Sequence, residues 1–359
     1  MSSLASIINN LTVSRSHQPL VILQSSNAQT SVPILRKVIS SATSSSATLL
    51  FTFLYPPSSL VDGRTSPSLQ VFDYTGHVPG YDTAWIDPRD EILATVTSAA
   101  AGSITVILDS IDTLVSDVSS TAQTYKFIQT LLQEILARSQ PSVLVLHLLS
   151  HAITALLLQT SFSPTLLHLV AHPSSLLTHV STTYLTLPPP AGTPEKFWSV
   201  FIPVTERTHD SERLVFGTDG HGSNAGVWSE SSGAQKGFRE FVVEVLVRNG
   251  GGEGRKRGVE RTLYGWKGNA PCELAELDSL KSLRVRKRIT EFAPNPIQNV
   301  SFNLTLTPSQ EKSRSEVPLP YAHEGKPSGV PISTPAAILY DPDSADDIDD
   351  DDPDEDLDI

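Results

Sequence analysis

The first half of the chain alternates short apolar runs with stretches in which apolar side chains recur at helical spacing. The runs are too short for helices and are rich in β-branched residues, so they predict strands. They cover 19–24, 47–55, 68–74, 104–108 and 142–149, and the helical stretches between them cover 32–39, 87–101 and 122–138. Strands that alternate with helices predict an α/β fold with a mainly parallel sheet and helices on both faces.

The run 104–108 is apolar throughout and predicts a strand buried on both faces. Asp109 follows it directly, and Asp112 comes three residues later. A buried parallel strand that presents a carboxylate at its carboxyl end occupies the position at which P-loop NTPases hold Mg²⁺. The sequence therefore predicts the scaffold of a nucleotide-binding protein around this strand.

The phosphate cradle of such a scaffold is missing. A P-loop needs glycines whose backbone N–H groups wrap the phosphates, and a lysine that reaches them. The segment after the first strand, 24–31, contains neither residue type. We therefore expect a structural role for Asp109, no catalytic residue, no metal site and no cofactor. The alternative is a ring ATPase whose degenerate nucleotide site is completed by a neighbouring subunit.

The pattern changes after three consecutive prolines at 188–190. The runs 197–204 and 238–248 have strand character, and 258–266 is expected to pair with 238–248 as a hairpin. We accordingly expect an α/β core over 1–190 and a β-rich extension with a basic glycine-rich loop over 191–289. Residues 290–359 are rich in proline, serine and charge, and predict a largely disordered acidic tail.

The charge of the chain is strongly asymmetric. The formal net charge is −13, but residues 341–359 alone carry twelve acidic and no basic side chains. Such a segment repels itself and stays extended when free. Ile348, Leu357 and Ile359 are spaced apolar side chains within it, so they are candidate anchors for docking on a basic partner; simple solvation of the tail is the alternative.

A basic segment precedes the tail. Residues 248–288 contain eleven basic and five acidic side chains, with Tyr264 and Trp266 interleaved. A basic, glycine-flanked loop beside aromatic residues suits RNA backbones and unstacked bases. The alternatives are a solvated hairpin tip and a surface that binds the chain's own tail. The candidate RNA-binding residues are Arg255, Lys256, Arg257, Arg261, Arg284, Arg286, Lys287 and Arg288.

The positions of histidine and cysteine bear on whether the chain has a zinc site or a disulfide. His147 and His151, and likewise His168 and His172, are four residues apart, but no Cys or Glu joins either pair in a zinc-type spacing. We expect histidines that are hydrogen-bonded in the core or lie at the surface. Cys272 is the single cysteine, so no intrachain disulfide forms and a reducing compartment is expected. The apolar stretch 142–162 carries polar residues and is better explained by a strand and a helix than by a membrane span.

Three unusual segments near the C-terminus resemble the Elongator complex protein 5 family. They are 299–310 (NVSFNLTLTPSQ), 317–321 (VPLPY), and the segment from 338 (ILYDPDSADDIDD) to the terminal DLDI. The strand 104–108 with its following Leu-Asp-Ser-Ile-Asp pattern is also similar to that family. The likeness is specific in the last sixty or so residues and weak elsewhere.

The resemblance implies a RecA-like domain without working nucleotide motifs. It further implies a non-catalytic subunit that forms a hetero-hexameric ring with Elongator proteins 4 and 6. The remaining Elongator subunits would then be partners too, and the assembly would support modification of the wobble uridine of tRNA, in cytoplasm and nucleus. The family supplies no catalytic residue to transfer to this chain.

Overall fold

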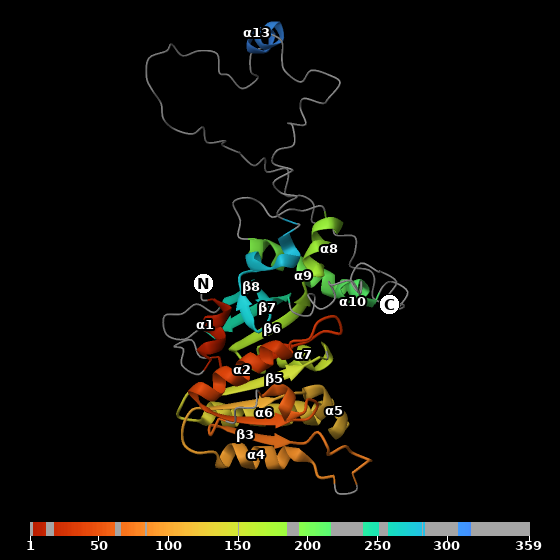
Figure 1. The fold of residues 1–359 in the computed structure, drawn as a ribbon. Helices are drawn as coiled ribbons and strands as arrows, with labels where there is room; N and C mark the ends of the chain where they lie inside the picture. Colours follow the sequence, from red (N-terminus) through yellow and green to blue (C-terminus); the bar gives the residue numbers. More distant parts are fainter. Residues whose placement is uncertain are drawn as a thin grey trace, which may run out of the picture. The chain divides into compact units, whose positions relative to one another are not determined.

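A computed structural model describes residues 3–11, 18–61, 66–82, 85–149, 151–184, 194–216, 240–250, 258–281, 283 and 308–316. The chain divides into two compact units, 1–293 and 294–359. Figure 1 shows the strands of the first unit and the helices that cover them.

The first unit contains all the described strands. They are β1 (Leu20–Gln24), β2 (Ala47–Thr52), β3 (Leu69–Asp73), β4 (Ile104–Leu108), β5 (Val143–Leu148), β6 (Leu166–Pro173), β7 (Glu240–Asn249), β8 (Gly258–Lys267) and β9 (Ala270–Cys272). The helices are α1 (Leu4–Asn9), α2 (Val32–Ser45), α3 (Pro57–Leu60), α4 (Pro88–Ser98), α5 (Ile111–Val118), α6 (Thr121–Ala137), α7 (His151–Leu157), α8 (Ser175–Thr183), α9 (Pro194–Arg207) and α10 (Asp210–Phe216), with 3₁₀ turns η1 (Leu274–Glu276) and η2 (Asp278–Leu280).

The described strands form one sheet in the order β3-β2-β4-β5-β1-β6-β7-β8-β9. The six strands β1 to β6 are mutually parallel, and β7, β8 and β9 continue the sheet by antiparallel pairing. One strand, β5, lies between β1 and β4, so the carboxyl ends of these three strands share one edge. The predicted fold class, α/β with a mainly parallel sheet and helices on both faces, is confirmed.

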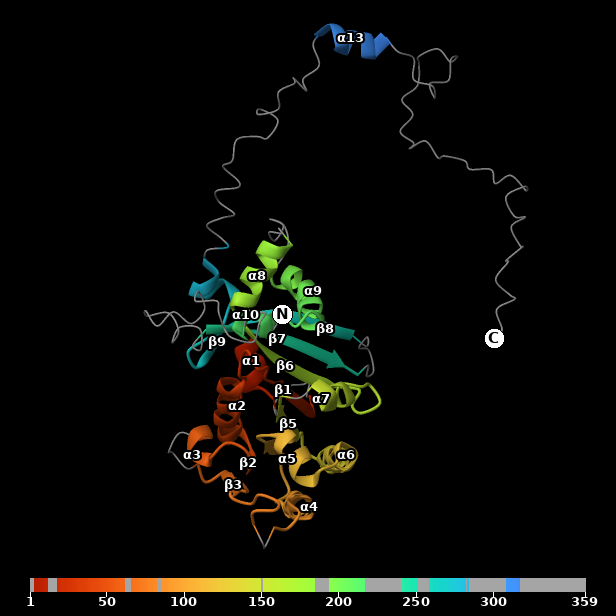
Figure 2. The same cartoon turned by 90° about the vertical axis from the view of Figure 1, so that its right-hand side faces the viewer.

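The helices cover the two faces of the sheet separately, as Figure 2 shows. α1 and α2 pack on one face over a cluster that includes Val21, Ile107 and Val145. α4, α5, α6 and α7 pack on the other face over a cluster that includes Val106 and Leu146. Because both faces are covered, β1, β4 and β5 are buried along their whole length, which explains their continuous apolar runs.

Local sequence signals set the helix boundaries. The side chain of Asp87 accepts a hydrogen bond from the Arg89 N–H and Pro88 occupies the first turn, so α4 begins where the sequence predicts. Ser120 caps α6 in the same way. Phe127, Leu131 and Ile135 recur at helical spacing and are buried, which fixes the face that α6 turns toward the sheet.

The predicted hairpin is confirmed. β7 pairs with β8 from Glu240 opposite Lys267 to Asn249 opposite Gly258, and β6 pairs with β7 from Leu166 opposite Arg248 onward. The hairpin therefore extends the sheet of the α/β core at its β6 edge and shares its core.

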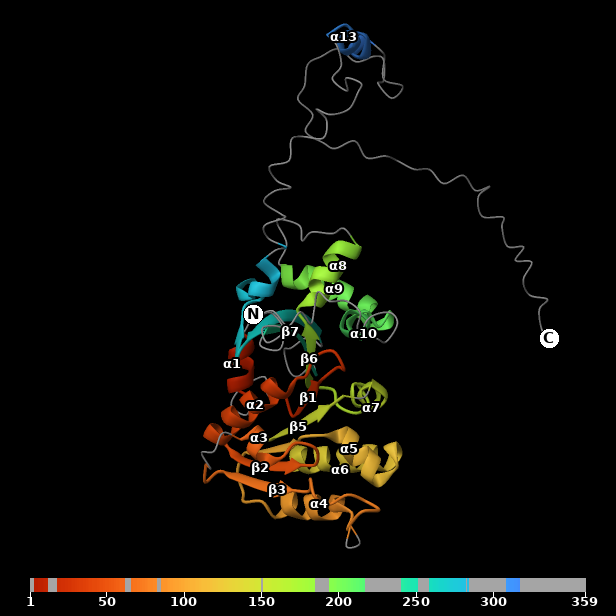
Figure 3. The ribbon, with the colours of Figure 1, turned by 45° about the vertical axis from the view of Figure 1, so that its right-hand side comes forward.

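The strand expected over 197–204 is wrong, because α9 covers these residues. Aromatic and β-branched side chains suggested a strand, yet Trp198, Ile202 and Thr205 are buried at helical spacing. Trp198 and Ile202 pack with Val242 and Leu263 of the hairpin in a third apolar cluster. Figure 3 shows α8, α9 and α10 near β7, toward the end of the sheet opposite β3.

The second unit is described only at α13 (Pro308–Glu316). This helix lies inside the segment expected to be largely disordered; its sequence is almost wholly polar, so periodicity gave no signal for it. Among the described residues, no helix is long and apolar enough to cross a bilayer.

Candidate functional site

The carboxyl ends of β1, β4 and β5 meet at the edge where an NTPase of this topology binds nucleotide. Ser25 follows β1, Asp109 follows β4, and His147 lies near the end of β5. These three residues and Ser31, at the start of α2, are all buried. The geometry among them decides whether an anion can bind here.

The segment that would be a phosphate cradle is closed by a serine–histidine network. The Ser31 N–H donates to Ser25 Oγ at 2.8 Å, and the two hydroxyls lie 2.9 Å apart. Ser25 Oγ is 2.9 Å from His147 Nε2, and His147 Nδ1 is 2.6 Å from the carbonyl oxygen of Asp109. The loop therefore folds onto its own side chains instead of around a ligand.

The network also fixes the tautomer of His147. A carbonyl only accepts, so Nδ1 carries the hydrogen toward Asp109. Burial lowers the pKa of His147, against the hydrogen bond to Asp109 and the charge of Asp112, which raise it. In the neutral ring Nε2 accepts from the Ser25 hydroxyl, whose oxygen in turn accepts from Ser31. Every polar atom of this network thus has a partner inside the fold.

The Asp109 carboxylate is hydrogen-bonded to the backbone that follows β2. It accepts hydrogen bonds from the N–H groups of Phe53, Leu54 and Tyr55 at 2.6, 3.1 and 2.8 Å. Burial raises the pKa of Asp109, and these backbone donors lower it. The side chain is fully buried, so it holds the β2–α3 connection. The structural role expected for Asp109 is confirmed.

Asp112 and Tyr55 complete this edge. Asp112 Oδ2 accepts from the Leu149 N–H at 2.6 Å. The Tyr55 ring lies edge-on to the His147 ring, with centroids 5.8 Å apart. Burial, together with Asp109 and Asp112, raises the pKa of the Tyr55 hydroxyl, so it stays protonated at neutral pH. Both carboxylates therefore bind backbone amides of neighbouring loops, a structural use that competes with magnesium coordination.

Most of the predicted RNA-binding residues, namely Arg255, Lys256, Arg257, Arg284, Arg286, Lys287 and Arg288, lie outside the described residues, as do Ile348, Leu357 and Ile359. Arg261 is described, on β8. Its Nε lies 2.7 Å from Glu244 Oε1, and its side chain is 37% exposed. The Arg261 guanidinium therefore forms an ion pair with Glu244 on the neighbouring strand.

The histidine pairs lie on strands or at a strand–helix junction, not on single helices. His147 belongs to β5 and His151 to α7, whereas His168 and His172 both belong to β6. His168 Nε2 lies 2.9 Å from Gln24 Oε1. Burial lowers the pKa of His168 to about 4. The prediction of hydrogen-bonded core histidines is confirmed for His147, His168 and His172.

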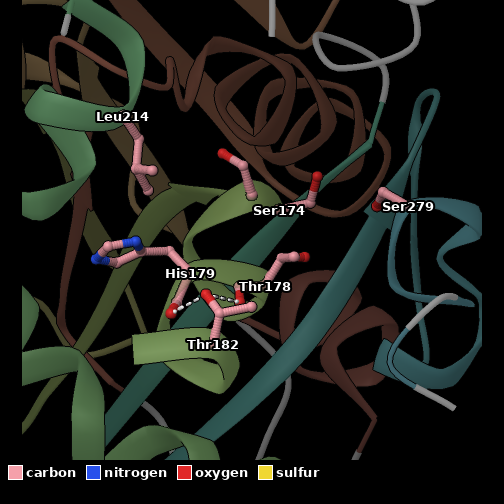
Figure 4. A pocket seen from close by; sticks show the side chains of 7 residues that line it. Ser174, Thr178, His179, Thr182, Leu214 and Ser279 are labelled. Carbon is pink, nitrogen blue, oxygen red and sulfur yellow. Dashed lines mark hydrogen bonds between the residues drawn. The ribbon is translucent and has the colours of Figure 1, made fainter. Parts of the chain in front are cut away.

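A shallow pocket lies beyond the end of β6 (Figure 4). His179 Nε2 lies 3.7 Å from Asp210 Oδ2, and the Thr182 hydroxyl donates to backbone oxygens of Thr178 and His179. The lining contains no Lys or Arg to bind a phosphate, so it does not replace the closed cradle. The lining residues are Ser174, Ser175, Thr178, His179, Thr182, Leu214 and Ser279.

Comparison with known proteins gives the family. A family model described as Elongator subunit Iki1 matches residues 7–341. The chain belongs to this family. It is similar to Elongator complex protein 5 of Danio rerio, 37% identical over 79 residues that cover 21% of this chain and 27% of that protein. The same protein of Mus musculus is 36% identical over 70 residues, 18% of this chain and 23% of that one.

These alignments span well under two thirds of the relatives' own length. Among solved structures, a KaiC-like protein of Pyrococcus horikoshii OT3 aligns with a TM-score of 0.36 and 8% identity, covering 74% of this chain and 93% of that one.

Sequence reasoning missed how the closed edge is held. The absent glycines and lysine were visible in 24–31, but Ser25 and His147 are 122 positions apart and nothing local links them. Asp109 and Phe53 are likewise 56 positions apart. The strand order brings these residues together, and the strand order is not readable from a single apolar run.

Proposed function

We propose that this chain is a non-catalytic Elongator subunit. It assembles with Elongator proteins 4 and 6 into a hetero-hexameric ring and supports modification of the tRNA wobble uridine through assembly and tRNA handling. The buried network of Ser25, Ser31, His147 and Asp109 carries the non-catalytic part of the proposal. Residues that would bind phosphate and magnesium in an NTPase are here bound to each other and to backbone amides.

The ring part is supported by family membership and by the fold. A domain that keeps a RecA-type sheet but closes its own nucleotide position still presents sheet edges and helix faces to neighbours. β3 lies at one edge of the sheet, and Val71 on it is 38% exposed. Heterologous contacts between such domains close into rings when the rotation between neighbours allows it.

Co-expression with Elongator proteins 4 and 6 tests the assembly. The expected result is one species with the mass of two copies of each subunit by light scattering after gel filtration. A chain that remains monomeric in the presence of both proteins would refute the ring. A parallel titration of the purified chain with Mg-ATP is expected to give no binding heat, and measurable binding would refute the closed cradle.

The alternative ATPase needs Asp109 to be available to magnesium supplied with a neighbour's phosphates. The three hydrogen bonds that backbone N–H groups donate to the Asp109 carboxylate weigh against this role. ATP turnover by the assembled ring distinguishes the non-catalytic subunit from the ATPase. If the subunit is non-catalytic, Asp109→Asn changes turnover only as far as it reduces the amount of assembled ring. A ring that assembles normally but loses turnover with this substitution would favour the ATPase.

We propose that the segment between β7 and β8 contacts tRNA. Charge reversal of Arg255, Lys256 and Arg257 to Glu is expected to weaken tRNA binding by the assembled ring and to flatten its salt dependence, because fewer counterions are released. Filter binding at several salt concentrations measures both effects. Unchanged affinity together with an unchanged slope would exclude the loop as a contact.

A further inference from the structure

A charged cluster crosses the sheet where the hairpin joins the core. Glu244 of β7 lies between His172 of β6 and Arg261 of β8. Its Oε2 is 3.0 Å from His172 Nε2, and its Oε1 is 2.7 Å from Arg261 Nε. The side chains of His172 and Glu244 are only 5% and 3% exposed, so this polar cluster is buried within the sheet.

α9 adds a third potential ligand to the cluster. Glu206, in the last turn of α9, is exposed, and its carboxylate lies with His172 and Glu244 in a group whose ligand atoms are all within 4.8 Å of one another. Trp198 and Ile202 fix α9 by packing against Val242 of β7. The three residues therefore come from three separate elements and converge because those elements pack together.

The donor set matches a borderline transition metal. One imidazole and two carboxylates are the ligand types that zinc takes in three-residue sites, with a further position left for water. The 3.0 Å between His172 Nε2 and Glu244 Oε2 is what two ligands each about 2 Å from one zinc ion can span. The Glu206 carboxylate already lies within 4.8 Å of the other two ligand atoms.

Charge and supporting contacts agree with a divalent cation. Two carboxylates and one guanidinium leave the group negative when His172 is neutral. Arg261 contacts Oε1 of Glu244 and so leaves Oε2 for an ion, which is how outer-shell groups commonly orient a ligating carboxylate.

We propose that His172, Glu206 and Glu244 bind one zinc-type divalent ion. The ion takes the place of the hydrogen between His172 Nε2 and Glu244 Oε2, the neutral imidazole then carries its hydrogen on Nδ1, and the ion fastens α9 to β6 and β7. The pairs His168/His172 and His147/His151 did not reveal this site in the sequence, because its carboxylates come from 34 and 72 positions away from His172. The inference is independent of the proposed role in Elongator.

Zinc binding by the full chain tests the site. The chelator-treated protein is loaded with zinc in the presence of a competing chelator and desalted, and retained metal is measured by mass spectrometry. We expect one zinc per wild-type chain. Glu206→Gln is expected to weaken zinc binding at least tenfold, since it removes a ligand from an exposed position without disturbing the core. The matched control is Glu260→Gln, another exposed acid-to-amide change, on β8 beside Arg261.

A second measurement separates this site from surface histidines, Cys272 and the acidic tail. Zinc that clamps α9 to the sheet stabilises the folded chain by mass action, so it raises the thermal midpoint of wild type and of Glu260→Gln. It is expected to raise the midpoint of Glu206→Gln much less. A wild-type chain that retains no zinc would overturn the proposal, and so would equal retention and equal stabilisation in wild type and Glu206→Gln.

Discussion

Asp109 shows how one residue of an enzyme-type scaffold has become a structural element. Its position after a buried strand is that of a magnesium-binding carboxylate, but its oxygens accept three successive backbone N–H groups. The bonds fix the chain just after β2 and close the edge toward His147. The same residue type in the same place here holds a loop through its backbone amides.

Replacing Asp109 by Asn is expected to destabilise the chain by about 2 to 4 kcal/mol, because an amide offers one acceptor atom where three backbone donors need partners. Urea unfolding followed by circular dichroism measures the change. Asp117→Asn is the matched control: burial also raises the pKa of Asp117, yet no hydrogen bond to its carboxylate occurs in the described part of the chain. A loss at Asp109 no larger than at Asp117 would contradict the structural role.

His147 should make the stability of the fold depend on pH. Burial lowers its pKa below the ordinary value of 6.5, so the unfolded chain takes up a proton more readily than the folded chain. The free energy of unfolding is therefore expected to fall as pH decreases through and below that value. His147→Gln, which cannot titrate, is expected to show a smaller decrease between about pH 7 and about pH 5.5.

Urea unfolding at several pH values measures this slope, and the slope matters more than the absolute stability of the variant. His77→Gln is the control, because the His77 side chain is 58% exposed and follows the edge strand β3 in the chain. An identical pH slope in wild type and His147→Gln would show that the buried imidazole is not responsible.

The hairpin β7–β8 illustrates packing between elements. A Cβ added at Gly265 of β8 would lie 2.8 Å from Cys272 Sγ, 2.8 Å from the carbonyl oxygen of Glu273 and 3.0 Å from Leu277 Cγ. The side chains could shift, but the backbone oxygen is held by the segment that leads into η1. β8 can therefore approach β9 and η1 this closely only with glycine at this position.

Gly265→Ala is expected to cost about 1 to 3 kcal/mol, the usual penalty for overpacking a filled site. Gly102→Ala provides the control, since a Cβ there meets nothing within 4 Å and the substitution should be neutral or slightly stabilising. Thermal unfolding of both variants distinguishes them. Equal midpoints for the two would mean that β9 and η1 move away freely.

The elements that could be predicted are those whose own sequence decides their structure. The strand 104–108 coincides with β4, and α6 lies within one residue of its predicted ends, because each has a complete apolar run or an unbroken helical face. The segment 197–204 misled because its residue types favour a strand while its packing on Val242 and Leu263 requires a helix. The contacts of Asp109, His147 and Glu206 depend on strand order and helix packing, which local patterns do not contain.

At the level of the whole chain, the sheet and its helices belong to the compact unit 1–293, and the acidic segment belongs to 294–359. All three apolar clusters are built from residues of the first unit. Because burial of apolar area is the main stabilising term, deleting 294–359 is expected to leave the urea midpoint of the remaining chain unchanged. A marked drop would show that the acidic segment supports the core.

The same deletion is expected to weaken binding to the rest of Elongator, because residues 341–359 supply twelve of the chain's acidic side chains and the three spaced apolar candidate anchors. Replacing Ile348, Leu357 and Ile359 by Ala keeps the charge and removes only the anchors. Quantitative mass spectrometry of purified complexes at low and high salt compares both variants with wild type.

If the anchors dock in a basic groove, the alanine variant loses binding at both salt concentrations, since apolar burial is not screened. If the tail acts by charge alone, the alanine variant binds as wild type does and only the deletion weakens the complex. The deletion then has its largest effect at low salt, because the electrostatic attraction that the tail provides is least screened there.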